Sequence, residues 1–235
     1  MNQVVQFGTM QMLVESLLDG FVSTKDVLSA GDYGIGTGEG VDGELVIIDG
    51  VAYQIDGEGQ VHEVGPDFPI AFGNVHKGDF QFLNEFENIT LKELQEEILK
   101  AVKTTSLFFA FKIEGDFDAV QTRSANKSSR PWPSLSKIAE GQNVFDAKNV
   151  GGTMVGYFSP KLFQGAAVPF YHQHFLSNEH NFGGHVLSAK LKHVKVSVQM
   201  LSGLDLRLPA DNADYRAADL NQLDHLNGAI KAAES

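Results

Sequence analysis

The sequence predicts an α/β protein with two lobes, in which mixed and mainly antiparallel β-sheets carry flanking helices. Most apolar segments are short and lie between turns rich in glycine and aspartate, which is typical of antiparallel strands. Helical periodicity is confined to a few segments, and no Pro- or Ser-rich linker divides the chain. We therefore expect residues 1–235 to form a single unit. Its N-terminal lobe would cover about residues 1–150, with a mixed sheet and helices, and its C-terminal lobe about 151–235.

The chain is expected to begin with an amphipathic helix. Apolar residues recur at helical spacing from Phe7 to Phe21, and Gly20 lies near the expected end. The next segment, Gly31–Gly40, is the densest in glycine. Its glycines alternate with other residues and strands follow it, so it does not fit a phosphate-binding loop. We expect a loop of close backbone approach or a bent edge strand there.

Strands dominate the rest of the chain. Asp49-Gly50 separates two apolar segments and predicts a hairpin, and Thr90-Leu-Lys-Glu93 fits a capping box that begins a helix. Residues 123–149 are expected to form a long functional loop with one short helical piece. The expected strands are 44–49, 51–56, 60–64, 106–114, 117–122, 152–158, 170–176, 185–201 and 204–208, with strand-like or irregular pieces at 69–76 and 77–83 and a C-terminal helix at about 219–233.

Composition and charge exclude several classes of function. The formal net charge of −12 leaves no basic stripe that could replace phosphate counterions, so neither nucleic acid nor an anionic membrane surface is an expected partner. The absence of cysteine excludes thiol catalysis, disulfides and thiolate metal sites, which leaves histidine and carboxylates as the strong ligands. No apolar stretch approaches the roughly 20 residues of a transmembrane helix. Residues 1–8 lack the basic start of a leader, so we expect a cytoplasmic protein.

Three histidines form the most informative pattern. His172 and His174 are two apart in an expected strand, so their side chains share one face. The polar segment 177–184 can turn the chain back, and the next strand would bring His185 to the same point. An H-x-H pair alone is more typical of a half-exposed strand, but the third histidine across a hairpin favours a metal site. Three His ligands without a fourth protein ligand leave an open position, as in catalytic metal sites.

Together with these histidines, several other motifs resemble the bacterial α-acetolactate decarboxylase family. The motifs are Gly36-Thr37-Gly38, Asp42-Gly43-Glu44-Leu45, the Asp49-Gly50 turn, Gln121-Thr122-Arg123-Ser124, His172-x-His174-Phe-Leu-Ser177 and Gly183-Gly184-His185-Val186. Each is weak alone, but together they are specific and extend over most of the chain. The resemblance implies a two-lobed α/β fold, a homodimer, and a zinc ion held by His172, His174 and His185. It also implies decarboxylation of 2-acetolactate to acetoin and carbon dioxide, a step of acetoin and butanediol biosynthesis.

Such a substrate needs no organic cofactor. Its ketone is β to the departing carbon dioxide and can receive the electron pair as an enediolate, whereas most decarboxylases need a pyridoxal or thiamine electron sink. A metal with open positions could chelate the hydroxyl and carbonyl oxygens of this enediolate, and one of its faces would be protonated selectively. Zinc suits neutral imidazole ligands and does no redox chemistry.

Four further residues are candidates for the site because of the resemblance. Arg123 by itself fits a surface cation, and Glu44 by itself fits a solvated acid at the start of a strand. The resemblance places both as catalytic and substrate-binding residues: Arg123 would hold the carboxylate or help to deliver the proton, and Glu44 would bond the hydroxyl or a metal-bound water. Thr37 would line the same pocket. The family's C-terminal tail returns a Glu to the metal, a catalytic role that we assign to Glu234.

The other histidines are interpreted as structural or surface residues. His180 could in principle replace His185 as a ligand, but it lies in the expected loop. His62, His76, His193 and His225 have no partner at ligand spacing and are expected to be half-buried or exposed. Two other functions are considered. A cupin-type metal enzyme would use Glu179 with the H-x-H pair but lacks its second motif here, and a non-catalytic metal- or small-molecule-binding module would keep the histidines without Arg123 or Glu44.

Overall fold

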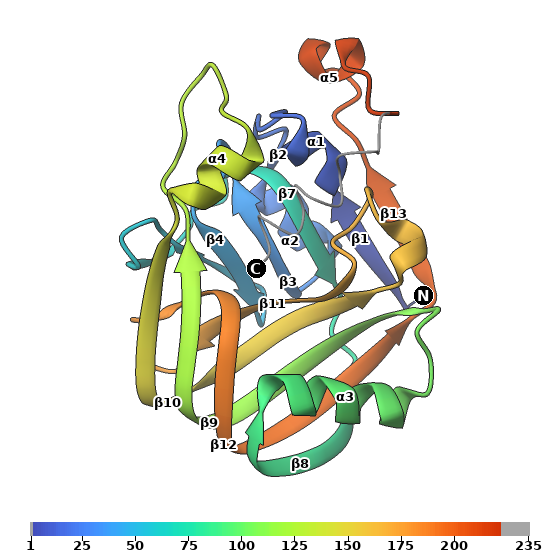
Figure 1. Cartoon of the computed structure of the whole chain (residues 1–235). Coiled ribbons are helices and arrows are strands. Elements are labelled where there is room, and N and C mark those ends of the chain that lie inside the picture. The colour runs from blue at the N-terminus through green and yellow to red at the C-terminus, as the bar shows by residue number, and fades with distance from the viewer. Residues whose placement is uncertain (1, 222–235) are drawn as a thin grey trace.

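The computed structural model describes residues 2–221, which form two β-sheets packed face to face with short helices at their outer surfaces (Figure 1). Buried residues of both sheets meet in one cluster that contains Ile35 of the first sheet and Ala110 and Tyr157 of the second. A second cluster joins Val46 and Leu176 in the same way. The α/β class with mainly antiparallel sheets is therefore confirmed.

The first sheet, here called sheet A, contains the N-terminal strands and one strand from near the C-terminal end. Its strand order is β13-β1-β7-β3-β4-β5-β6, with β2 paired to β7. The β1–β13 pair is parallel, and the others are antiparallel. The strands are β1 (Gln3–Phe7), β2 (Val22–Ser23), β3 (Tyr33–Gly38), β4 (Glu44–Ile48), β5 (Val51–Ile55), β6 (Val61–Glu63), β7 (Pro69–His76) and β13 (Gly203–Arg207).

The second sheet, sheet B, is built from long bent strands. Its order is β11-β10-β9-β12-β8, and β11 also pairs with β12. This additional pairing is the one that joins His174 to His185. The strands are β8 (Gln81–Thr90), β9 (Phe108–Ser124), β10 (Asn143–Ser159), β11 (Phe170–Ser177) and β12 (Gly183–Leu201).

The helices cover the sheets and close one end of the space between them. Helix α2 packs on sheet A, and α3 buries Leu94 and Ile98 against the phenylalanines of sheet B. Helices α1 and α4 share a separate cluster, in which Met10 and Leu13 meet Leu135. The helices are α1 (Met10–Val14), α2 (Thr24–Ala30), α3 (Leu91–Val102), α4 (Leu135–Glu140), the 3₁₀-helix η1 (Lys161–Phe163) and α5 (Ala213–Ala217).

Two local predictions are confirmed in detail. The Asp49-Gly50 turn joins β4 to β5, and both residues have the positive φ angles of a two-residue hairpin turn, 51° and 77°. Helix α3 begins with the predicted capping box. The Thr90 side chain accepts a bond from the Glu93 backbone N–H, and the Glu93 carboxylate accepts one from the Thr90 backbone N–H.

The predicted N-terminal helix from Phe7 to Phe21 is wrong for most of its length. Residues 3–7 form β1, whose residues from Val4 to Phe7 are buried between β7 and β13. The helix begins only after Thr9, whose hydroxyl accepts a bond from the Met12 backbone N–H, and it ends before Ser16, which has a φ of 60°. The partner β13 lies about 200 residues away in sequence, so its pairing could not enter a local pattern.

Three other expectations need correction. The segment 31–40 contains a central strand, β3, and not an edge strand, although the expected close approach is real: a Cβ on Gly36 would lie 2.4 Å from the Phe72 carbonyl oxygen. The strands expected at 106–114 and 117–122 are one strand, which bends at Gly115 with a φ of 146°. The expected loop 123–149 contains α4 but ends early, because β10 already pairs Asn143 with Ser124.

The boundary between the two sheets is not near residue 150, which lies inside β10. The chain passes from sheet A to sheet B between His76 and Gln81 and returns after Leu201. The expected helix at 219–233 and Glu234 lie outside the described residues. Within residues 2–221, no helix has the length and apolarity that a membrane span requires.

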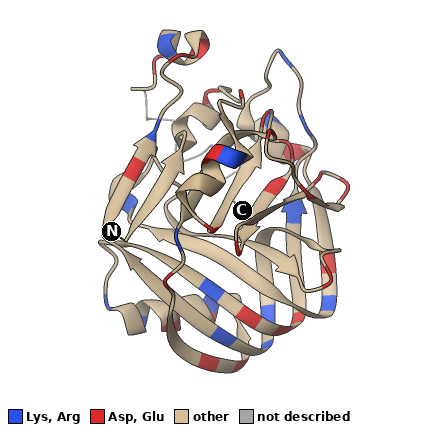
Figure 2. Ribbon diagram, turned by 180° about the vertical axis from the view of Figure 1, so that it is seen from behind, with Lys and Arg blue, Asp and Glu red and all other residues tan. Residues whose placement is uncertain are grey.

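Positions of Lys or Arg and of Asp or Glu are interleaved along the strands of sheet B, as Figure 2 shows. Lys112 lies 3.1 Å from Glu114, and Lys190 lies 3.6 Å from Asp118. Acidic and basic residues are therefore mixed along these strands, despite the acidic excess of the chain.

Candidate metal centre

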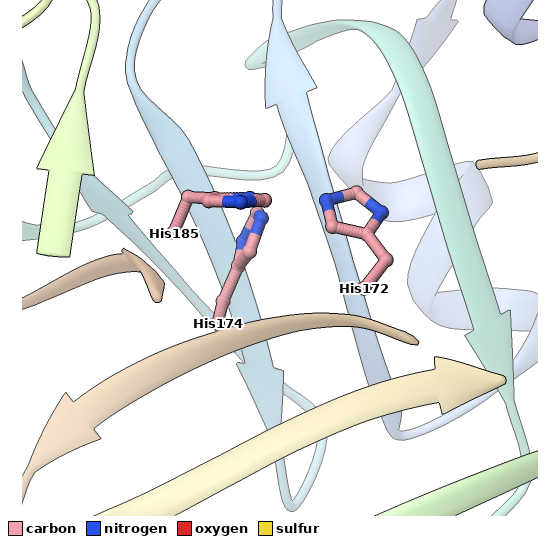
Figure 3. A group of neighbouring side chains, drawn as sticks. All are labelled: His172, His174 and His185. Atoms are coloured by element: carbon pink, nitrogen blue, oxygen red, sulfur yellow. The ribbon is translucent and has the colours of Figure 1, made fainter. Parts of the chain in front are cut away.

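The three predicted histidines meet in the structure. His172 and His174 alternate along β11 and point to one face, and His174 pairs directly with His185 of β12. The hairpin that follows β11 provides this register, because Ser177 accepts bonds from the backbone N–H groups of Asn181 and Phe182. In Figure 3 the three rings converge on one point.

The distances between the rings fit one shared ion. One ligand atom from each histidine lies within 4.8 Å of the others. The ring centroids are 5.1 Å apart for His172 and His174, 5.0 Å for His172 and His185, and 5.5 Å for His174 and His185. Two nitrogens bound to one zinc at about 2.0–2.1 Å each lie at most about 4.2 Å apart. Ligand atoms within 4.8 Å of one another can therefore share one ion after small side-chain adjustments.

Burial keeps the three imidazoles neutral. His172, His174 and His185 are 9%, 1% and 4% exposed. Burial, assisted by the Arg123 guanidinium, lowers the pKa of His172 to about 3. Burial also holds the pKa of His174 and of His185 well below the ordinary value, and the neighbouring histidines and Arg123 add to this. Neutral imidazole is the form that binds a metal.

His174 shows most directly that the site fits a cation. Its Nδ1 lies 2.7 Å from the carbonyl oxygen of Leu45. A carbonyl only accepts, so Nδ1 carries the hydrogen and Nε2 carries a lone pair. That Nε2 is buried and makes no hydrogen bond to the described residues, and Oε2 of Glu44 lies 3.3 Å from it. A lone pair beside a carboxylate oxygen is the environment of a bound cation, and the backbone contact fixes the ring as in other metal sites.

Arg123 and Glu44 come from opposite sheets and reach the same pocket. Glu44 is the first residue of β4 in sheet A. Arg123 lies near the end of β9 in sheet B, where it pairs with His185 of the neighbouring strand β12. Both side chains are buried, at 8% and 4% exposure. An Arg123 Nη donates a bond to Oε1 of Gln142 at 3.0 Å. The candidate site therefore lies between the two sheets and is lined by residues of both.

Thr37 also lines this pocket, as predicted from the sequence. Its hydroxyl donates a bond to the Gly43 carbonyl oxygen at 2.7 Å. The hydroxyl proton is therefore already used, and toward a ligand the Thr37 oxygen can act only as an acceptor.

Sequence reasoning missed Gln142 and the apolar side of the pocket. A single Gln after a short helix carries no recognisable signal, and apolar side chains that line a pocket look like ordinary core residues. The apolar lining residues are Met10, Leu13, Val41, Phe72 and Leu135. They come from α1, α4, β7 and the loop between β3 and β4, so the pocket combines the polar histidine cluster with an apolar lining.

The remaining described histidines lie outside the site. His180 is exposed at the hairpin turn and contacts the Tyr53 ring, so it is not a ligand. His62 pairs with Asp56, and His193 lies near Glu85 and Glu87 on the surface. His76 was expected to be half-buried or exposed, but it is fully buried between the sheets, where its Nδ1 lies 2.8 Å from the Tyr157 hydroxyl.

The cupin alternative finds no support in this geometry. Glu179, which it would use as a ligand, is exposed in the turn after β11, whereas the three histidines are buried.

Comparisons with known proteins agree on one family. The family model for alpha-acetolactate decarboxylase matches residues 4–222. The alpha-acetolactate decarboxylase of Streptococcus thermophilus is 33% identical over 237 residues, covering 99% of this chain and 98% of that protein. That of Methanosarcina mazei is 32% identical over 92% of this chain and 75% of its own length. The crystal structure of alpha-acetolactate decarboxylase from Bacillus subtilis strain 168 superposes with a TM-score of 0.95 at 30% identity and covers 99% of both chains.

Proposed function

The chain belongs to the alpha-acetolactate decarboxylase family, and from this premise we propose that it converts 2-acetolactate to acetoin and carbon dioxide with a zinc ion bound to His172, His174 and His185. The observation that carries the proposal is that three neutral histidines, the buried Glu44 side chain and the buried Arg123 guanidinium line a single pocket. A non-catalytic binding module would not require Arg123 and Glu44 beside the histidines.

A bound divalent metal would supply a Lewis acid that stabilises the negative charge on the substrate oxygens. The histidines suit that role because they are neutral and held in place. His174 is oriented by the Leu45 carbonyl, and His185 is fixed by its strand pairing. This support lets the ligand set stay rigid during turnover.

Arg123 binds the substrate carboxylate and stabilises charge while the carbon–carbon bond breaks. Its guanidinium is permanently charged and cannot accept a proton, so it acts by donating hydrogen bonds. The bond to Gln142 restricts its orientation before substrate binds. Charge stabilisation by a preorganised group in a buried site is a large contribution to catalysis.

Glu44 accepts a hydrogen bond from the substrate hydroxyl and keeps a proton close to the enediolate. Its position on β4, across from the β11 and β12 histidines, confines the substrate between the two sheets. The apolar residues of the lining, such as Leu13 and Leu135, exclude water from the carbon that receives the proton. Because some walls of the pocket are polar and others are apolar, one face of the planar enediolate is protonated in preference to the other.

The test is direct. Purified protein is incubated with 2-acetolactate, and acetoin and carbon dioxide are measured before chelation, after chelation and after zinc is restored. We expect activity to survive exhaustive dialysis without any organic cofactor, to disappear with the chelator and to return with zinc. Absence of acetoin from the zinc-loaded protein would refute the proposed reaction, and a requirement for thiamine diphosphate would refute the mechanism. Assembly as a homodimer and a cytoplasmic location stay predictions from the sequence.

A further inference from the structure

Gln142 occupies a defined position in the pocket, although it lies outside the sheets' strand pairings. Helix α4 (Leu135–Glu140) is capped by Ser134 and buries Leu135 and Ile138 in the cluster shared with α1. Gly141 is its C-cap residue, and the backbone N–H of Gln142 donates a hydrogen bond to the Ala139 carbonyl oxygen at 3.3 Å. The anchored helix therefore fixes the backbone from which the Gln142 side chain reaches the pocket.

The contact with Arg123 determines which way the Gln142 amide is turned. A guanidinium has only donors, so the amide oxygen must face it, and Oε1 lies 3.0 Å from the Arg123 Nη. The amide nitrogen then faces elsewhere. It makes no hydrogen bond to the described residues, and Gln142 lines the same pocket as the histidines.

We propose that Gln142 is a substrate-binding residue, whose amide NH₂ donates a hydrogen bond to the substrate carboxylate beside the Arg123 guanidinium. This proposal rests on the proposed function, because it assumes a carboxylate substrate. A carboxylate offers about four lone-pair sites and can accept bonds from both groups at once. Among the described side chains that line this pocket, Arg123 is the only Lys or Arg, so a carboxylate that enters the pocket is attracted to the Arg123 side.

A neutral amide serves this role better than an acid would. Glutamate at position 142 would pair with Arg123 and cancel the charge that attracts the anion. Glutamine accepts a hydrogen bond from Arg123 with its amide oxygen and can donate one with its amide nitrogen, and it adds no negative charge beside the guanidinium. The residue therefore acts in two ways, as a support for Arg123 and as a donor to the ligand.

Two probes separate the carboxylate from the rest of the substrate. Lactate has the hydroxyl and the carboxylate without the ketone, and acetoin has the hydroxyl and the ketone without the carboxylate. Binding of each to the zinc-loaded protein is measured by isothermal titration calorimetry for the wild type, Gln142→Met, Gln142→Glu and the control Gln60→Met, which changes an exposed turn residue. Zinc content is measured for every variant.

We expect Gln142→Met and Gln142→Glu to bind lactate at least about tenfold more weakly, because a bond to a charged group is lost, and to bind acetoin within about twofold of the wild type. Gln60→Met should match the wild type for both probes. Lactate binding by Gln142→Met within about twofold of the wild type, an equal loss for acetoin, or no lactate binding by the wild type would overturn the proposal. A wild-type protein that binds lactate but makes no acetoin from acetolactate would instead refute the proposed function.

Discussion

Nε2 of His174 lies 3.3 Å from Oε2 of Glu44, although the two residues belong to different sheets. The Leu45 carbonyl, next to Glu44 on β4, orients the same imidazole through Nδ1. One short segment of sheet A thus supports a ligand of sheet B and places an acid beside it. The geometry of the candidate metal centre consequently depends on how closely the two sheets pack.

Replacing any one of the three histidines should remove the metal. His172→Ala, His174→Ala and His185→Ala each leave two ligands, and we expect elemental analysis to show little zinc and assays to show no acetoin formation. His180→Ala is the matched control, because His180 is exposed at the hairpin turn. A full metal complement in His185→Ala would contradict the ligand assignment.

Arg123→Lys should impair turnover without affecting the metal. An ammonium cannot reproduce the planar guanidinium and its bond to Gln142. We expect kcat to fall by about 10²–10³, as for the loss of a preorganised charge stabiliser, with zinc content unchanged. Arg216→Lys, on the exposed surface of α5, is the control. Wild-type kcat in Arg123→Lys would exclude a role in the transition state.

Glu44→Gln should keep zinc and slow the reaction. The amide retains an oxygen beside His174 but removes the charge that accepts from the substrate hydroxyl. A loss of about tenfold to a hundredfold in kcat is expected from one charge-assisted hydrogen bond. Chiral chromatography should also show a less pure acetoin enantiomer. The control Glu58→Gln changes an exposed acid, and kinetics of Glu44→Gln equal to those of this control would argue against the assignment.

His76 should make the stability of the protein depend on pH. Burial lowers the pKa of His76 to about 4, with Asp32 opposing part of this effect. Below about pH 6.5 the unfolded chain binds a proton at His76 that the folded protein does not bind, so stability falls as the pH drops from 6.5 to 4. The shift from 6.5 to about 4 corresponds to roughly 3 kcal/mol.

Urea unfolding of the wild type and His76→Asn at several pH values checks this expectation. The metal ligands contribute equally to both proteins, so the difference between their pH slopes isolates His76. The variant should lose less stability between pH 6.5 and 4. Exposed His193→Asn should follow the wild type, and identical slopes for His76→Asn would contradict the assignment.

The C-terminal assignment remains a prediction, because Glu234 lies outside the described residues. If the tail returns an acid to the site, Glu234→Gln should lower kcat with zinc retained, and a chain ending at Lys231 should behave similarly. Near wild-type kinetics for the shortened chain would show that the tail has no catalytic part.

The histidine cluster was more predictable than the fold around it. His172, His174 and His185 follow from alternation in a strand and from a short hairpin, which are local relations. Glu44, Arg123 and Thr37 needed the family resemblance, because each residue type is common at such positions. The structure brings all six of these side chains to one pocket.

The features that could not be predicted from the sequence depend on contacts between residues that are far apart in the chain. The local pattern predicts a helix where β1 lies, because the partners of this strand, β7 and β13, are far away in sequence. The Leu45 carbonyl is a backbone group and has no sequence signature. Gln142 reaches Arg123 only because α4 ends where β10 begins, a relation that requires the three-dimensional fold.

The parallel pairing of β1 with β13 has a consequence for how the protein is made. One side of β1 can find its neighbour only after residues 203–207 have left the ribosome, when both strands that carry the histidines have already been synthesised. Until then a nascent chain exposes an unpaired strand edge, which is a site of misassociation. We therefore expect ribosome-bound chains that end before β13 to depend on chaperones, and to form the complete enzyme only after release.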